Sequence, residues 1–149
     1  MIDLSQHLTE HRVIELVGTT KEAVLAELTA SFEAAPEVAD AAALLAAILK
    51  RERIVSTGIG LGVAIPHAKI DSVADFVLAY GRSLAGIPFD AIDDQPVHHV
   101  VVIAGPPDQQ QRYLQFLATV TLKMKDAVLR ATLAAADGPA TMRRTLCDS

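Results

Sequence analysis

One stretch of the sequence combines alternating glycines with a histidine. It reads Gly58-Ile-Gly-Leu-Gly-Val-Ala-Ile-Pro-His67, and Lys69 follows two residues later. Glycines at this density allow tight turns and leave backbone N–H groups uncovered, which suits an anion such as phosphate. The apolar run over 63–65 is typical of a buried strand, and Pro66 is expected to end it. His67 is therefore expected at a sheet edge, beside a loop suited to phosphate.

Two common phosphate motifs do not fit this stretch. The spacing differs from G-x-G-x-x-G and leads into a strand, so a dinucleotide site is excluded. No G-K-[ST] step is present, so a nucleoside triphosphatase loop is excluded as well. The glycines alone are explained most simply as a plain turn. It is the Ile-Pro-His67 step beside them that favours a functional site.

The composition is that of a globular protein. The 149 residues are 51% hydrophobic and 21% charged, which predicts one domain over 1–149 with a sizeable core. No apolar run is long enough to span a membrane, no signal peptide is recognisable, and the lone Cys147 forms no internal disulfide. We expect a cytoplasmic protein without direct membrane insertion. The net charge of −5 argues against nucleic acid as a partner.

The predicted elements alternate between strands and helices. A capping box of Thr19 and Glu22 opens the first helix, Asp40 caps the second, and charged residues 50–53 end the second. Strands are expected over 12–17, 63–65, 75–84 and 97–104, and helices over 19–35, 40–53, 109–125, 126–136 and 139–147. The near-continuous apolar strand over 97–104 indicates burial on both faces. This order predicts an α/β fold, a mixed sheet with helices on both faces.

Several polar residues are assigned ordinary roles. His98 and His99 are adjacent on a strand, so their side chains should point to opposite faces and cannot share a metal. One of them is expected to border the active groove, and no set of ligands completes a metal site. Asp90, Asp93 and Asp94 are explained by a solvated turn, and Cys147 by a structural or inert role.

Arg51 strengthens the case for His67. It lies at the end of the second helix, and the segment between them can fold the two side chains together. A guanidinium there can bind two oxygens of a phosphoryl group on the histidine. Phosphoryl transfer needs mainly positioning and charge neutralisation, so one nucleophile, one arginine and a few N–H donors suffice without a cofactor.

The motif around these residues resembles a known family. The run Arg51-Glu-x-x-x-Ser-Thr-Gly-Ile-Gly-x-Gly-Val-Ala-Ile-Pro-His67 is similar to the phosphorylation site of enzyme IIA domains of the bacterial sugar phosphotransferase system (PTS), fructose/mannitol class. The later run Pro88-Phe-Asp-Ala-Ile-Asp-Asp-Gln-Pro-Val97 resembles the stand-alone nitrogen-regulatory branch of that class. The similarity extends from about residue 5 to the C-terminus.

The resemblance implies a phosphocarrier with a mixed sheet flanked by helices. His67 would accept a phosphoryl group from the carrier protein HPr or its nitrogen-branch counterpart, and Arg51 would stabilise its charge. Onward transfer would go to a IIB protein, or the phosphorylated state would act as a regulatory signal. Ser56, Thr57, Gly58, Gly60 and Gly62 would form the phosphate loop.

The sequence departs from the family at one position. Tyr113 stands where the family usually has a second histidine, and Tyr113 and Lys69 are accessory candidates. A phenol can donate a hydrogen bond to a phosphoryl oxygen but carries no positive charge near pH 7. Two alternatives therefore stay open: a regulatory module whose partners depend on His67 phosphorylation, and a relative that has lost phosphotransfer.

Overall fold

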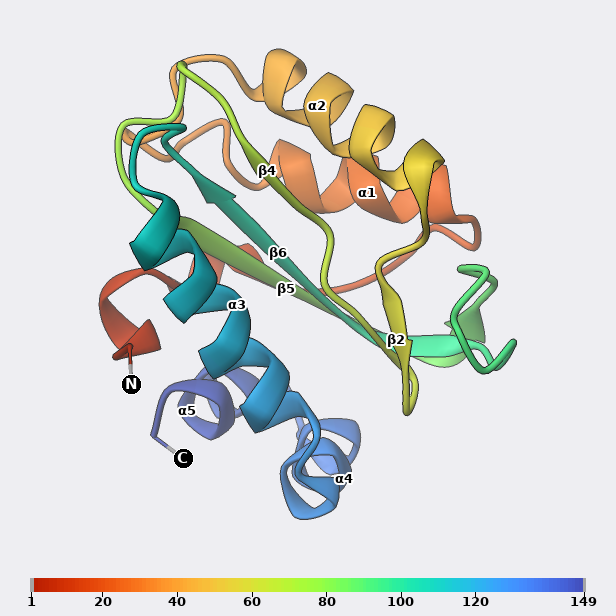
Figure 1. Cartoon of the computed structure of the whole chain (residues 1–149). Helices are drawn as coiled ribbons and strands as arrows, with labels where there is room; N and C mark the ends of the chain where they lie inside the picture. The colour runs from red at the N-terminus through yellow and green to blue at the C-terminus, as the bar shows by residue number, and fades with distance from the viewer. Residues whose placement is uncertain (1, 149) are drawn as a thin grey trace.

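A computed structural model of the protein describes residues 2–148, which form one six-stranded sheet between two layers of helices (Figure 1). The strands are β1 (Val13–Glu15), β2 (Gly58–Gly60), β3 (Val63–Ala64), β4 (His67–Lys69), β5 (Val77–Ile87) and β6 (Val97–Gly105). The α-helices are α1 (Lys21–Ala30), α2 (Ala41–Ile54), α3 (Gln110–Met124), α4 (Ala127–Ala135) and α5 (Pro139–Asp148). Two short 3-10 helices, Leu4–Gln6 and Glu10–Arg12, precede β1.

The sheet is mixed, and β6 is its central strand. The strand order is β1-β5-β6-β3-β2, and β4 also pairs with β6. β5 runs antiparallel to β6, whereas β3 and β4 run parallel to it. All residues of β6 except His98 are buried, which confirms the prediction of a strand covered on both faces.

Helices pack on both faces of this sheet, as predicted. α1 and α2 cover one face with side chains such as Val24, Leu28, Leu44 and Ile48. α3, α4 and α5 cover the other face, and they contribute Phe116, Val120, Leu133 and Met142. Because each strand of the pair β5 and β6 presents apolar side chains to both layers, the molecule has two hydrophobic cores separated by the sheet.

Most boundaries agree with the sequence prediction, but α1 ends at Ala30 rather than at residue 35, and two further details were wrong. The N-cap of α1 is Thr20 rather than Thr19, and its side chain accepts from the Ala23 amide at 3.2 Å. Pro66 interrupts the β3 strand but does not end the pairing, because His67 begins β4 and continues along the same edge of β6. Because proline has no N–H to donate to a neighbouring strand, the interruption of the strand at Pro66 could be predicted from the sequence. The pairing of His67 beyond it depends on β6 and could not.

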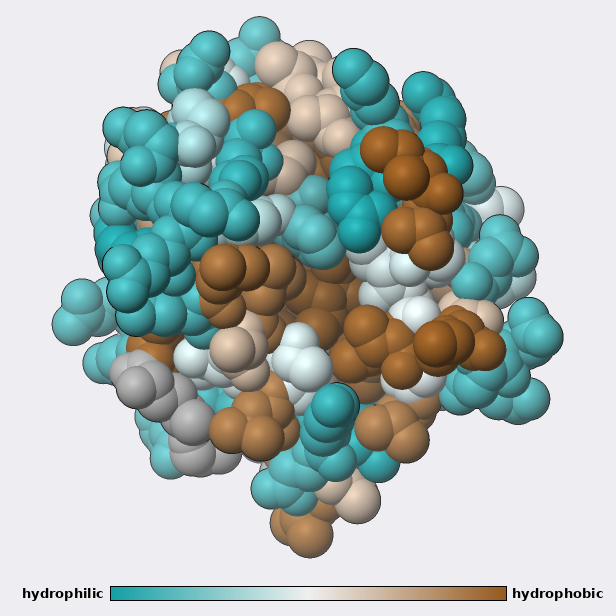
Figure 2. All heavy atoms as spheres, viewed as in Figure 1, coloured by the Kyte–Doolittle hydropathy of each residue, from teal (hydrophilic) through white to brown (hydrophobic). Residues whose placement is uncertain are grey.

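Over residues 2–148 no helix is both long and apolar enough to cross a membrane. The face seen in Figure 2 shows apolar side chains gathered near its centre, where β2, β4 and α3 lie in the same view of Figure 1. Exposed side chains in or near these elements include Ile54, Val55 and Leu114.

Candidate active site

His67 is the first residue of β4 and is held in a defined orientation. Its Nδ1 lies 2.7 Å from the carbonyl oxygen of Ile65. Because a carbonyl oxygen only accepts, Nδ1 carries the proton and Nε2 carries the lone pair. Burial lowers the pKa of His67, and the positive charges of Arg51 and Lys69 act in the same direction. The ring is therefore a neutral imidazole near pH 7, with Nε2 as its nucleophilic atom.

Tyr113, from α3, lies against this imidazole. The two ring centroids are 5.7 Å apart in an edge-on arrangement. Lys69 places its Nζ 4.8 Å from the centre of the Tyr113 ring and also donates to Gln110. Burial raises the pKa of Tyr113 to about 12, so its hydroxyl stays protonated and able to donate. Both accessory candidates, Tyr113 and Lys69, are thus gathered beside His67.

Arg51 reaches the same region from the last turn of α2. Its Nη1 donates to the carbonyl oxygen of Val55 at 3.0 Å, which bonds it to the residue that caps the helix. Its positive charge lowers the pKa of both His67 and Tyr113, so the guanidinium lies within electrostatic range of both rings. The sequence prediction that the segment between 51 and 67 folds these residues toward one another agrees with this arrangement.

Glu52 was predicted from the sequence to belong to a charged helix end. Its side chain is instead buried and supports the site through hydrogen bonds. Its carboxylate accepts from the Thr57 amide at 2.8 Å and from the Thr57 hydroxyl at 2.7 Å. Nζ of Lys21, from α1, lies 3.2 Å from this carboxylate and over the Phe89 ring. This cluster joins the end of α2 to the start of β2. Its only signal in the sequence was an acidic residue beside Arg51.

The first phosphate-loop residues are already engaged in hydrogen bonds. The Ser56 hydroxyl donates to the carbonyl oxygen of Phe89 at 2.6 Å and accepts from the Gly58 amide at 3.1 Å. The Thr57 amide is bound to Glu52. Gly58 is needed for close approach, because an added Cβ would lie 2.7 Å from the Cβ of Ala91. The expectation of free N–H donors is therefore wrong for Thr57 and Gly58.

Gly60 and Gly62 form the tip of a hairpin that points away from His67. Gly60 pairs with Val63, Val63 pairs with His99 of β6, and His67 pairs with Ile103 of β6. Four residues along β6 correspond to about 13 Å, which a phosphoryl group on His67 does not span. We therefore correct the assignment of these two glycines to the phosphate loop. Their positive φ angles, 89° and 75°, show that they shape the turn instead.

Other candidates lie elsewhere. Arg112 stacks on Phe76 and Phe116, and its Nη1 lies 3.4 Å from the Asp75 carboxylate. These contacts engage the guanidinium with residues other than Tyr113. Asp93 accepts from the amide of Leu61 at 3.2 Å and so supports the hairpin tip. Over residues 2–148 no cluster of three or more His, Cys, Asp or Glu side chains could hold a metal ion.

Comparisons with known proteins agree with this fold and motif. The sequence matches the family described as "Phosphoenolpyruvate-dependent sugar phosphotransferase system, EIIA 2" over residues 6–148. It is 36% identical over 89% of its length to the PTS system fructose-specific EIIABC component of Bacillus subtilis, of which it spans 21%. It is 35% identical over 91% of its length to the fructose-specific EIIA component of Haloferax volcanii, of which it spans 88%.

Solved structures show the same fold. The nitrogen regulatory protein IIA-Ntr of Neisseria meningitidis superposes with a TM-score of 0.89 at 24% identity, over 96% of this chain and 98% of that one. Enzyme IIA mannitol of Escherichia coli, in a complex with phosphorylated enzyme IIB mannitol, superposes with a TM-score of 0.79 at 18% identity over 93% and 96% of the two chains. The family match spans nearly the whole sequence, and this chain therefore belongs to the EIIA 2 family of the phosphotransferase system.

Proposed function

We propose that this chain is a phosphocarrier that receives a phosphoryl group on Nε2 of His67. The observation that carries the proposal is the hydrogen bond from Nδ1 to the carbonyl oxygen of Ile65. It fixes the tautomer that leaves Nε2 unprotonated, on a histidine whose pKa is lowered by burial. Membership of a phosphotransferase family supports this role.

The transfer balances without an added acid or base. The phosphorus–nitrogen bond of a phosphohistidine on the donor protein breaks, and its electron pair returns to the donor nitrogen. The lone pair on Nε2 of His67 forms the new phosphorus–nitrogen bond in line. The ring keeps its proton on Nδ1 and becomes positively charged, and the carbonyl oxygen of Ile65 stabilises that charge through the existing hydrogen bond.

Charge on the phosphoryl oxygens would be neutralised by Arg51. A guanidinium can donate to two oxygens at once, and this one would leave the carbonyl of Val55 by rotation of its side chain to do so. The Tyr113 hydroxyl would add one neutral donor. Because Ser56 and Thr57 already bond to the backbone and to Glu52, we assign them to the support of the site.

The partners would be proteins that carry a phosphoryl group on a side chain. HPr or a related carrier is the proposed donor, and a IIB protein is a proposed acceptor. Enzyme IIA mannitol, whose fold this chain shares, forms a complex with phosphorylated IIB mannitol. Exposed Leu114 follows Tyr113, and exposed Ile54 and Val55 follow Arg51, so apolar contact area borders the reacting atoms.

A regulatory use of the phosphorylated state is the second candidate. Tyr113 favours it, because a neutral phenol with a pKa of about 12 stands beside His67 where the family usually has a titratable histidine. Onward transfer would be slower in that case, and the phosphorylated form would persist as a signal. Pull-downs with wild type, His67→Ala and His67→Asp separate the two uses, because only regulation predicts partners that differ among the three.

The direct test is phosphorylation by a reconstituted system of phosphoenolpyruvate, enzyme I and HPr. We expect a mass gain of one phosphoryl group that is lost in acid. His67→Ala should abolish the gain, and the matched control His11→Ala, at an exposed histidine far along the chain, should retain it. A gain that survives in His67→Ala would refute the proposal.

A further inference from the structure

A second concave site lies at the other end of β6, between the sheet and α4. It has a volume of about 430 Å³, which is within the range of small-molecule sites. Arg82, His98, His99 and Arg130 line it, and Leu61 and Leu84 form an apolar rim. We call this cavity the basic pocket. No Asp or Glu is among its lining residues within the described chain.

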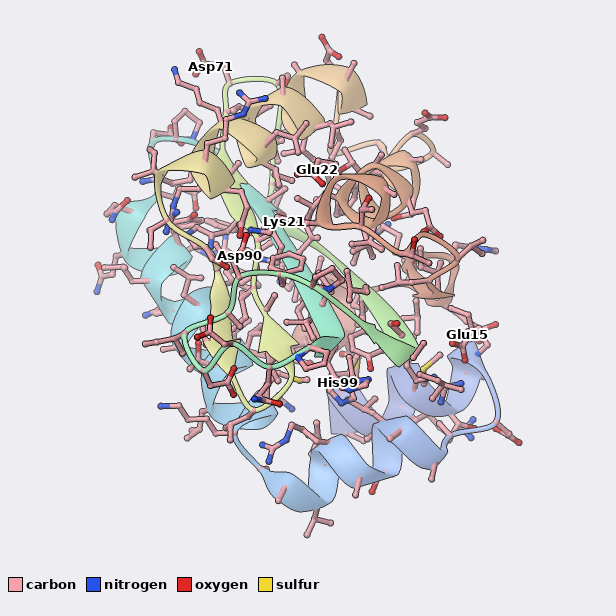
Figure 3. All side chains as sticks on the ribbon, turned by 90° about the vertical axis from the view of Figure 1, so that its right-hand side faces the viewer. Glu15, Lys21, Glu22, Asp71, Asp90 and His99 are labelled. Carbon is pink, nitrogen blue, oxygen red and sulfur yellow. The ribbon has the colours of Figure 1, made fainter. Side chains whose placement is uncertain are left out.

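A β-bulge turns both histidines toward this pocket. The amides of His98 and His99 donate to the same carbonyl oxygen, that of Gly62, at 2.8 and 2.9 Å. Two residues of β6 thus oppose one residue of the hairpin, and the usual alternation of side chains is lost. The prediction that His98 and His99 point to opposite faces is therefore wrong, and neither borders His67. Figure 3 shows His99 where the sheet faces the C-terminal helices.

Arg82 supplies a buried donor. Its Nη1 donates to the carbonyl oxygens of Leu133 and Ala136 at 2.8 Å, and its Nη2 pairs with Glu15. Only 5% of the residue is exposed, and its Nε has no hydrogen-bond partner among residues 2–148. A buried N–H without an acceptor is costly, and Arg82 is among the residues that line the basic pocket.

His99 and Arg130 supply two further donors. The Tyr80 hydroxyl and His99 Nδ1 lie 2.7 Å apart, and the hydroxyl has no other hydrogen-bond acceptor among residues 2–148. Tyr80 therefore donates to Nδ1, which places the His99 proton on Nε2. Arg130 lines the pocket and uses Nη1 to bond the carbonyl oxygen of Met124 at 2.8 Å, which leaves its other N–H groups as candidate donors. The basic pocket thus presents donors from His99 and Arg130 and the positive charge of Arg130, whereas the charge of Arg82 is paired with Glu15.

We propose that the basic pocket binds a small organic carboxylate with a short apolar chain. The carboxylate accepts from His99 Nε2 and Arg130, and the carbon chain lies against Leu61 and Leu84. Charge-assisted hydrogen bonds to a planar carboxylate suit guanidinium donors, and the apolar rim favours an anion with a hydrocarbon part over inorganic phosphate.

The pocket is separate from His67. Since Val63 pairs with His99 and His67 pairs with Ile103, the two sites lie about 13 Å apart along β6. The proposed binding of a carboxylate in the basic pocket is therefore independent of the proposed phosphotransfer at His67.

The test is a titration of the isotope-labelled chain with sodium butyrate, followed by amide chemical shifts. Saturable shifts are expected at His98, His99, Leu61 and Leu84. Arg130→Gln should weaken butyrate binding about tenfold, as expected for loss of a charged hydrogen bond. Leu84→Glu should weaken it as well, by placing a negative charge at a rim position that is 67% exposed and tolerant of change.

Matched controls use residues outside the pocket. Arg144→Gln, at an exposed arginine of α5, and Leu122→Glu, at a leucine that is 59% exposed on α3, should leave butyrate binding unchanged. Uncharged butyramide and inorganic phosphate should each bind more weakly than butyrate. The proposal is overturned if butyramide matches butyrate, if phosphate binds more tightly, or if Arg130→Gln and Leu84→Glu both bind butyrate like wild type.

Discussion

Replacing Glu52 with glutamine tests whether the buried carboxylate of Glu52 stabilises the protein through its contacts with Thr57 and Lys21. The Glu52 side chain is 3% exposed and accepts two hydrogen bonds from Thr57, at 2.8 and 2.7 Å, while Lys21 lies 3.2 Å away. Glutamine keeps the shape and can still accept from the Thr57 amide. The charge opposite Lys21 is lost, and the hydroxyl of Thr57 loses a carboxylate acceptor.

The expected loss in the free energy of unfolding depends on how far the charge of Lys21 stays compensated in the variant. Removing one partner of a buried ion pair costs about 3–5 kcal/mol when the other charge is left uncompensated. Lys21 remains 14% exposed, lies over the Phe89 ring and has Asp90 at 3.9 Å, so part of its charge stays compensated. We therefore expect Glu52→Gln to lower the free energy of unfolding by about 2–3 kcal/mol, just under that range.

Urea unfolding followed by circular dichroism measures this loss, and a double-mutant cycle isolates the ion pair. Glu33→Gln, at an exposed glutamate, should cost less than about 0.5 kcal/mol. In a Lys21→Met background, Glu52→Gln should cost at least about 1 kcal/mol less than in wild type. An equal loss in both backgrounds, or a loss no larger than that of Glu33→Gln, would refute the reasoning.

Three further outcomes follow from the structure. Burial lowers the pKa of His99 to about 4, so on acidification the unfolded chain binds a proton at this residue before the folded chain does. The free energy of unfolding should therefore fall by about 2–3 kcal/mol as the pH drops from 6.5 to 4. Unfolding measured at the two pH values should show this loss in wild type and not in His99→Gln. Gly58→Ala should destabilise by about 1–3 kcal/mol in urea because its Cβ meets the backbone of Ala91 at 2.8 Å, whereas Gly138→Ala, with nothing within 4 Å, should be nearly neutral. Tyr113→Phe should shorten the half-life of phosphorylated His67 about tenfold, because one hydrogen-bond donor to the phosphoryl group is lost. The half-life is measured by the release of labelled phosphate. An unchanged half-life would show that Tyr113 does not contact the phosphoryl group.

Local signals predicted the parts of the fold that depend on neighbouring residues. Asp40 caps α2 as expected and accepts from the Ala43 amide at 3.0 Å, because capping involves residues three apart. The apolar run over 97–104 identified the central strand, because a strand covered on both faces needs apolar side chains at every position. Both predictions rest on physics contained within one segment.

The features that were missed depend on pairing between distant segments. β4 exists because β6 offers a free edge beyond Pro66, and nothing near His67 in the sequence indicates that edge. The bulge at His98 and His99 arises from one shared carbonyl, that of Gly62. The Glu52–Lys21 pair joins residues from two helices, so the charged end of α2 could be interpreted only as solvated.

The long motif from Arg51 to His67 combines chemistry with support. Within this motif, Arg51 and His67 are the residues that we propose to contact the phosphoryl group, and the residues between them hold those two in place. Glu52 anchors Thr57, the amide of Ile65 donates to the carbonyl oxygen of Thr57 at 3.1 Å, and the carbonyl oxygen of Ile65 then sets the tautomer of His67. A perturbation at Glu52 is therefore connected to His67 through backbone hydrogen bonds. Substitutions in the middle of the motif should affect the orientation of the imidazole before they affect its chemistry.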